Sequence, residues 1–173
     1  MSEERQLAAR LYAEYEQAMY RTAFGVLKNS YDAEDAVHEA FLGIIKGGML
    51  SRLTDAGSSG TKAYILTAAR NAAINILNKR KRTVAVEAFD DVATASAEET
   101  VLSAAGVGEI KAALLALPKG DYEILCLSLV GGASGEETAA VLGISYDAAR
   151  QRIHRARMRL AKILSEGVAK NDK

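Results

Sequence analysis

The 173-residue sequence has very few of the residues that build disulfides and metal sites. It contains one cysteine, Cys126, two histidines, His38 and His154, and no tryptophan. A single cysteine excludes an internal disulfide framework and a cysteine-only metal site. Two histidines argue against a histidine-rich metal centre. We therefore expect a protein that needs neither a metal nor another cofactor.

Proline and long apolar runs are scarce as well. Pro118 is the only proline, and much of the chain is rich in Ala, Leu, Glu, Arg and Lys, which favour helices. The N-terminus is charged and lacks the apolar segment of a signal peptide. The longest uncharged apolar stretch, residues 124–135, is too short to cross a bilayer. The sequence therefore predicts an all-α protein of the cytoplasm, with no insertion into a membrane.

Charged residues are plentiful but segregated along the chain. The net charge is zero, yet residues 61–82 contain six basic residues and no acidic one, and so do residues 150–162. Between them, residues 83–103 contain five acidic residues and no basic one. This pattern indicates two anion-binding surfaces joined by an acidic spacer. The alternative is two solvated helix faces that are basic without having a ligand.

Apolar residues spaced by three and four predict amphipathic helices along most of the chain. In the N-terminal half we expect helices at about residues 6–28, 32–46 and 61–81, with a Gly- and Ser-rich loop at 47–60. Residues 83–108 are small, acidic and poorly periodic, which indicates a flexible linker. In the C-terminal half we expect helices at about residues 109–117, 121–130, 136–142 and 147–164. The pattern predicts two small helical domains.

The last two helices have the pattern of a helix-turn-helix. Ser134 is suited to cap the first of them, Gly143 to make the turn and Ser145 to cap the second. Ile144 is expected to anchor the turn in the core. The second helix would bury a stripe at spacings of four, three and four, formed by Ala149, Ile153, Ala156 and Leu160.

The remaining surface of that second helix is strongly basic. It carries Arg150, Gln151, His154 and Arg155, flanked by Arg152, Arg157 and Arg159. A major groove admits one helix, in which Arg binds guanine or phosphate and Gln pairs with adenine. The pattern therefore favours DNA binding over its alternative, a generic helical hairpin with a basic exterior.

Three segments of the sequence resemble one known family. The segment LPKGDYEILCLSLVGGASGEETAAVLGISYDAARQRIHRARMRLAKIL resembles region 4 of a bacterial sigma factor of the extracytoplasmic-function (ECF) group, in the sigma-70 family. LYAEYEQAMYRTAFGVLKNSYDAEDAVHEAFLGIIK resembles regions 2.1 to 2.2, and AYILTAARNAAINILNKRKR resembles regions 2.3 to 2.4. The resemblance implies region 2 at residues 1–82, a linker at 83–108, region 4 at 109–166 and a tail at 167–173.

The resemblance also implies partners and binding residues. Core RNA polymerase would be bound by region 2 through the coiled coil of its largest subunit, at Asp35, His38, Glu39 and Leu42, and would also be contacted at its flap region. The minus-ten promoter element would be opened and read at Arg70, Asn71, Asn75, Lys79, Arg80, Lys81 and Arg82, with the loop at residues 58–61 as a base pocket. The minus-thirty-five element would be bound by Arg150, Gln151, Arg152, His154, Arg155 and Arg157. An anti-sigma factor would hold the protein inactive.

The chain departs from the family pattern at three places in region 2. Histidine stands at His38 where glutamine is common, and Asn75 replaces the aspartate of the Arg-Asn-x-x-Ile-Asp motif. The tryptophan that often precedes the third helix is absent, and Tyr64 is the nearest aromatic residue. These departures affect the expected base preference rather than the general role.

Two other functions compete with that of a transcription initiation factor. One is a sigma-like decoy that captures an anti-sigma factor without binding DNA, although such a decoy would not need the arginines of residues 150–159. The other is an ordinary helix-turn-helix regulator with an unrelated N-terminal domain. An enzyme is not expected, because no phosphate-binding loop, nucleophile–base set or carboxylate pair stands out. Cys126 is expected to be a small buried apolar residue.

Overall fold

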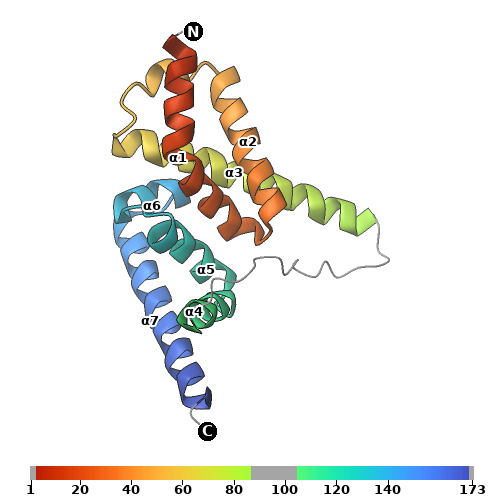
Figure 1. The fold of residues 1–173 in the computed structure, drawn as a ribbon, viewed down its shortest axis with the longest axis vertical. Helices are drawn as coiled ribbons and strands as arrows, with labels where there is room; N and C mark the ends of the chain where they lie inside the picture. Colours follow the sequence, from red (N-terminus) through yellow and green to blue (C-terminus); the bar gives the residue numbers. More distant parts are fainter. Residues whose placement is uncertain (1–2, 87–104, 172–173) are drawn as a thin grey trace.

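The computed structural model describes residues 3–86 and 105–171, and all regular structure in these ranges is helical (Figure 1). This confirms the predicted all-α fold of two small helical domains. None of the described helices is long and apolar enough to span a membrane.

The N-terminal domain is formed by α1 (Glu3–Leu27), α2 (Ser30–Lys46) and α3 (Ser59–Val86). Residues 28 and 29 separate the first two helices: Lys28 has a φ of 53°, and Asn29 caps α2 by accepting a hydrogen bond from Asp32 N–H at 3.0 Å. The three helices bury one apolar core, whose largest fully buried side chains in this domain are Leu11, Met19, Ile65 and Leu66.

The loop between α2 and α3 packs against the core of the N-terminal domain. It contains a short 3₁₀ helix, η1 (Leu50–Arg52), and buries Leu50, Leu53 and Ala56 in the domain core. The Tyr15 hydroxyl, buried on α1, donates a hydrogen bond to the Ala56 carbonyl. The loop therefore sets the entry to α3, where Ser58 Oγ accepts a hydrogen bond from Thr61 N–H at 3.1 Å.

The C-terminal domain contains α4 (Ala105–Leu115), α5 (Lys119–Leu125), η2 (Cys126–Val130), α6 (Gly135–Leu142) and α7 (Tyr146–Asn171). A second apolar cluster lies between α5 and α7, with Leu117, Tyr122, Leu125 and Ala156 buried in it. The helical segment expected at 121–130 is not one uniform α-helix. After α5 it widens into the π-helical turn η2, where Gly131 N–H bonds to the Cys126 carbonyl at 2.7 Å.

The expected linker at residues 83–108 is shorter than predicted at both ends. α3 continues to Val86 and α4 begins at Ala105. Adding a residue to an existing helix costs less than starting a new one, so both helices can extend through residues of low helix propensity. The rest of the expected linker, residues 87–104, lies outside the described residues.

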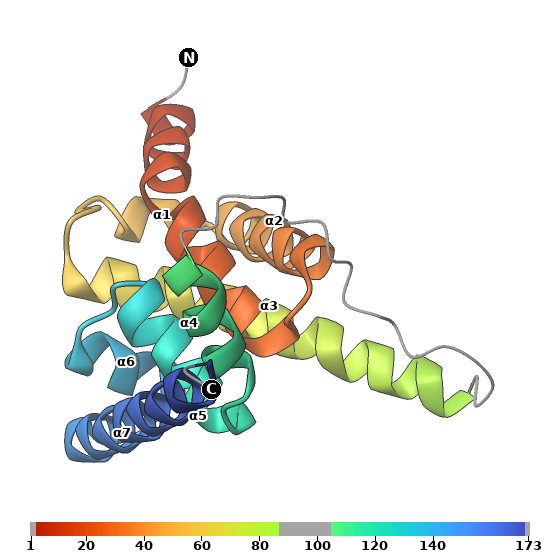
Figure 2. The ribbon, with the colours of Figure 1, turned by 60° about the horizontal axis from the view of Figure 1, so that its bottom comes forward.

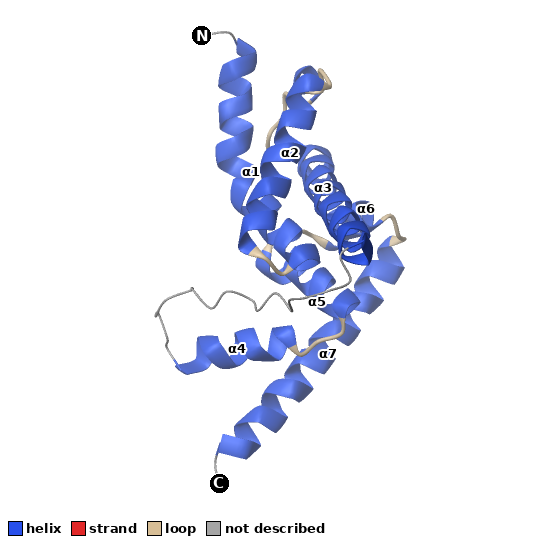
Figure 3. Cartoon of the chain, turned by 90° about the vertical axis from the view of Figure 1, so that its right-hand side faces the viewer, coloured by secondary structure: helices blue, strands red, loops and turns tan. Residues whose placement is uncertain are grey.

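The two domains pack against each other instead of lying apart on a tether. α6 lies along α3, while α5 and η2 lie against α1 (Figure 2 and Figure 3). Leu127, Ala133 and Val141 of the C-terminal domain are buried in the N-terminal core. The approach is closest at Gly25, where a Cβ would lie 2.9 Å from Cys126 Cβ. Glycine is therefore needed at this position for the domains to close.

Candidate nucleic-acid interface

The helix-turn-helix is built as the sequence predicts. Ser134 and Glu137 form a reciprocal capping box: Glu137 N–H bonds to Ser134 Oγ at 3.1 Å, and Ser134 N–H bonds to Glu137 Oε2 at 2.8 Å. Gly143 ends α6 in the left-handed conformation, with φ 64°. Ser145 Oγ then accepts a hydrogen bond from Ala148 N–H at 3.1 Å at the start of α7. The prediction for Ile144 holds only in part, because this side chain is half-buried.

The basic face of α7 is fully presented to solvent. Ala149 and Ala156 are buried against the domain core, Ile153 and Leu160 are half-buried, and the polar residues lie on the opposite side. Every predicted minus-thirty-five residue is exposed, namely Arg150, Gln151, Arg152, His154, Arg155 and Arg157. Four of them line a surface hollow of about 590 Å³ together with Gly135, Tyr146 and Ile153. This surface has the shape and the charge to bind a nucleic-acid backbone.

Arg159 differs from the other arginines of α7. Its guanidinium is paired with Asp121 at the start of α5. It therefore ties α7 to α5 within the domain.

The predicted polymerase-binding residues share an exposed face of α2. Asp35, His38, Glu39 and Leu42 are all exposed, and Leu42 is 51% exposed although it is apolar. The opposite face of α2 is buried in the core through Ala36, Val37, Ala40, Phe41 and Ile44. Leu42 therefore lies outside the apolar core of the domain and is accessible to a partner protein.

The predicted minus-ten residues fall into two groups. Asn71, Asn75 and Lys79 recur every four residues along one exposed strip of α3, next to exposed Lys81 and Arg82. Arg80 instead bonds the buried carboxylate of Asp32, with nitrogen–oxygen distances of 2.5 and 2.6 Å. Arg80 thus stabilises the fold of region 2, since Asp32 would otherwise be left as an unpaired buried charge, and its contact with phosphate stays a prediction.

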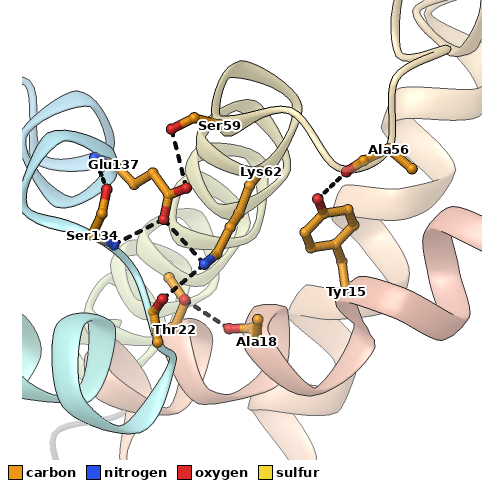
Figure 4. A network of polar contacts seen from close by, with 9 residues as sticks. Tyr15, Ala18, Thr22, Ala56, Ser59, Lys62, Ser134 and Glu137 are labelled. Carbon is orange, nitrogen blue, oxygen red and sulfur yellow. Dashed lines mark hydrogen bonds and ion pairs between the residues drawn. The ribbon is translucent and has the colours of Figure 1, made fainter.

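Arg70 is also occupied, by a carboxylate of the other domain. Its Nε lies 2.5 Å from Glu123 Oε1 of α5, and both side chains are largely buried. A second such contact joins Lys62 to Glu137, with 3.1 Å between Nζ and Oε2 (Figure 4). No local signal in the sequence marks Glu123 or Glu137 as a contact between the domains. The capping box Ser-x-x-Glu can be recognised in the sequence, but the pairing of Glu137 with Lys62, 75 residues earlier, cannot.

The surroundings of Glu137 favour its ionised form. Burial by itself would raise the pKa of this carboxyl, but bonds from Ser134 N–H, Lys62 and Ser59 hold the pKa below its ordinary value of 4.5. Cys126 behaves in the opposite way. It is 5% exposed, and burial raises the pKa of its thiol, as expected for a small buried apolar residue.

Comparison with known proteins assigns both domains. Residues 11–83 match the family model of sigma-70 region 2, and residues 108–160 match that of sigma-70 region 4. The chain is also 33% identical over 144 residues to the RNA polymerase sigma factor CarQ of Myxococcus xanthus, covering 82% of this chain and 79% of CarQ. It is 27% identical over 162 residues to the ECF RNA polymerase sigma factor SigM of Bacillus subtilis, covering 91% and 95%. The chain belongs to the ECF group of sigma factors.

The fold of this sigma factor agrees with that of a solved relative. The co-crystal structure of the sigma factor RpoE with the anti-sigma factor NepR from Bartonella quintana matches it with a TM-score of 0.66 and 26% identity, over 91% of this chain and 96% of that one. The protein is therefore a transcription initiation factor and not an enzyme, and its partners are RNA polymerase and promoter DNA. The match to region 2 contradicts the alternative of a helix-turn-helix regulator with an unrelated N-terminal domain.

Proposed function

We propose that each domain of this sigma factor carries one promoter-binding surface and that α2 carries the polymerase-binding surface. Region 4 would bind the minus-thirty-five element through Arg150, Gln151, His154 and Arg155 on α7. The observation that carries this assignment is the complete exposure of that basic face beside a buried alanine stripe. Arg152 and Arg157, exposed on the same helix, are suited to phosphate contacts. The flap region of the polymerase would hold region 4 at the promoter.

Region 2 would open and read the minus-ten element along α3. Asn71 and Asn75 present amide groups that can hydrogen-bond to base edges, and Lys79, Lys81 and Arg82 present charges to the phosphates of a single strand. Arg70 would join them once Glu123 has released it. The loop at residues 58–61 would receive an unstacked base.

Core polymerase would bind the exposed face of α2 through the coiled coil of its largest subunit. Leu42 supplies an apolar contact, and Asp35, His38 and Glu39 surround it with polar groups. An anti-sigma factor would compete for such surfaces, because a relative of the same fold has been crystallised with the anti-sigma factor NepR. The protein would act in the cytoplasm, where its polymerase is found. We propose region 2 at residues 1–82 and region 4 at 109–166; α3 and α4 extend into the expected linker at 83–108, and α7 extends into the expected tail at 167–173.

The test is polymerase capture followed by run-off transcription from a fragment upstream of the protein's own gene. Asp35→Arg reverses a charge on the α2 face and should weaken co-elution with core polymerase at least tenfold, without a change in melting temperature. Glu4→Arg makes the same charge change at an exposed position on α1 and should leave binding unchanged. Normal co-elution of the Asp35→Arg variant would contradict the assigned face, and failure of the unmodified protein to co-elute would contradict the function.

A further inference from the structure

Region 4 places acidic groups on the part of region 2 that is assigned to the minus-ten element. Arg70 Nε is bonded to Glu123 Oε1 at 2.5 Å. Lys62 Nζ is bonded to Glu137 Oε2 at 3.1 Å and to the Gly132 carbonyl at 2.7 Å. At the start of α3, Ser59 Oγ donates to Glu137 Oε1 at 3.1 Å (Figure 4). The groups involved on region 2 are a guanidinium, an ammonium and a hydroxyl.

These three groups are the ones that proteins use to bind nucleic-acid phosphates. In the structure their acceptors are carboxylate and carbonyl oxygens of region 4, which have the same charge or polarity as a phosphate oxygen. The contacts are partly buried: the side chains of Lys62 and Arg70 are 25% and 23% exposed, and those of Glu137 and Glu123 are 10% and 16% exposed. A DNA phosphate would therefore have to compete with a carboxylate for each cation.

We propose that Glu123 and Glu137 form an internal latch that substitutes for DNA and holds the free sigma factor in a closed form. The latch must open before Lys62, Arg70 and the loop at residues 58–61 can bind the minus-ten strand. This inference rests on the proposed role of α3. It adds that region 4, besides binding its own promoter element, competes with DNA for region 2.

The placement of the two acids supports a latch over incidental surface pairs. Each acid lies on a different helix of region 4, α5 and α6, and each bonds a different turn of α3. The Glu137 carboxylate also caps α6, so its position is set before any contact with region 2 is made. The interface also includes Leu127, Ala133 and Val141 buried in the N-terminal core and the close approach of Gly25 to Cys126. Beside them, the Lys28 ammonium lies 4.5 Å from the centre of the Tyr122 ring, and Arg21 donates to the Val130 carbonyl at 2.8 Å.

The only cysteine of the chain is a built-in probe of opening. Cys126 is 5% exposed, and a Cβ at Gly25 would lie 2.9 Å from its Cβ. The apolar cluster of region 4 covers part of Cys126, and α1 completes the cover only in the closed form. The rate at which 5,5′-dithiobis(2-nitrobenzoic acid) modifies the thiol therefore reports the open population of the free protein. This measurement needs neither polymerase nor promoter.

The test variant is Glu123→Gln/Glu137→Gln. Glutamine keeps the shape of both side chains, and at position 137 it preserves the capping acceptor while removing the charge. The matched control is Glu136→Gln/Glu166→Gln, which removes two charges from exposed positions of region 4. The control is needed because any loss of negative charge favours DNA binding in general. Melting curves confirm that both variants fold.

We expect the test variant to react with the thiol reagent about tenfold faster than the control, since two partly exposed charge-assisted bonds are lost. We also expect it to bind a fluorescent single-stranded dT20 about tenfold more tightly than the control at low ionic strength. Gly25→Leu should give the same two changes by wedging α1 away from Cys126, whereas Gly167→Leu, at an exposed position with open space around it, should give neither.

Two results would overturn the latch. Thiol rates equal in test and control variants would show that the acids do not hold the domains closed. Faster thiol reaction with unchanged dT20 affinity would show that the acids do not compete with DNA. Failure of the unmodified protein to support transcription would instead count against the proposed function, because both latch measurements are made on the protein alone.

Discussion

Three substitutions at Glu137 and Ser134 separate the contribution of Glu137 to the helix cap from its contribution to the domain contact. The carboxylate accepts the Ser134 N–H bond of the capping box and, with its charge, binds Lys62 and Ser59. Glu137→Ala removes all of these bonds. Glu137→Gln removes the charge and keeps the capping bond, and Ser134→Ala removes the cap and keeps the charge.

The structure sets the expected order of the three variants. Loss of a cap lowers the free energy of unfolding by about 1 kcal/mol. Loss of a charge-assisted bond lowers it by about 1.5–3 kcal/mol when buried, and by less here because Lys62 is 25% exposed. We therefore expect decreases of about 1 kcal/mol for Ser134→Ala, about 1–2 kcal/mol for Glu137→Gln and about 2–4 kcal/mol for Glu137→Ala.

Urea unfolding followed by far-ultraviolet circular dichroism measures these differences at neutral pH. Glu136→Ala serves as the control, because Glu136 is exposed in the same turn of α6 and should change the free energy of unfolding by less than about 0.5 kcal/mol. Equal values for Glu137→Gln and the unmodified protein would refute the contribution of the ion pair. Equal values for Glu137→Gln and Glu137→Ala would refute the contribution of the cap.

Three further predictions concern pH, DNA and the core. Because the pKa of Glu137 is lowered on folding, the contribution of its charge to the free energy of unfolding is complete above pH 4.5 and is lost as the pH falls through the folded-state pKa. The difference in the free energy of unfolding between the unmodified protein and Glu137→Gln should therefore shrink between pH 7 and pH 3. A constant difference would contradict the ion pair. Arg150→Ala/Arg155→Ala should weaken binding of promoter duplex by at least tenfold in a gel-shift assay, whereas Arg5→Ala/Arg10→Ala, which removes two exposed charges from α1, should not. Leu66→Ala, at a fully buried position, should lower the free energy of unfolding by about 2–5 kcal/mol. Leu42→Ala, at an exposed position, should lower it by less than about 1 kcal/mol. Similar decreases for the two variants would contradict the assigned core.

The features that sequence analysis predicts well are those encoded within a few residues. Ser134, Gly143 and Ser145 mark the ends of α6 and α7 because capping depends on backbone groups three or four residues away. The exposed face of α7 follows from the same short spacing, since a buried alanine stripe leaves one orientation for the arginines. The family resemblance then supplied the function that spacing alone could not.

Charge blocks read along the sequence do not show which cations are paired with carboxylates in the fold. Residues 61–82 contain no acid, yet in space Arg80 meets Asp32, which is 48 residues away, and Arg70 meets Glu123, which is 53 residues away. These partners come from other helices, and only the packing of the helices brings them close. The π-helical turn η2 likewise packs on α1, a contact that no local signal encodes.

The two ends of α3 differ in whether their basic residues form ion pairs with region 4. Lys79, Lys81 and Arg82 are exposed at its C-terminal end, whereas Lys62 and Arg70 are held by region 4. Phosphates can therefore bind the C-terminal end while the domains remain closed, and that binding is electrostatic and independent of sequence. Under the proposed latch, binding at Lys62, Arg70 and the loop at residues 58–61 would require replacement of the carboxylates. Discrimination of the minus-ten element would then be coupled to opening of the domains, whereas a weak general affinity for DNA would not.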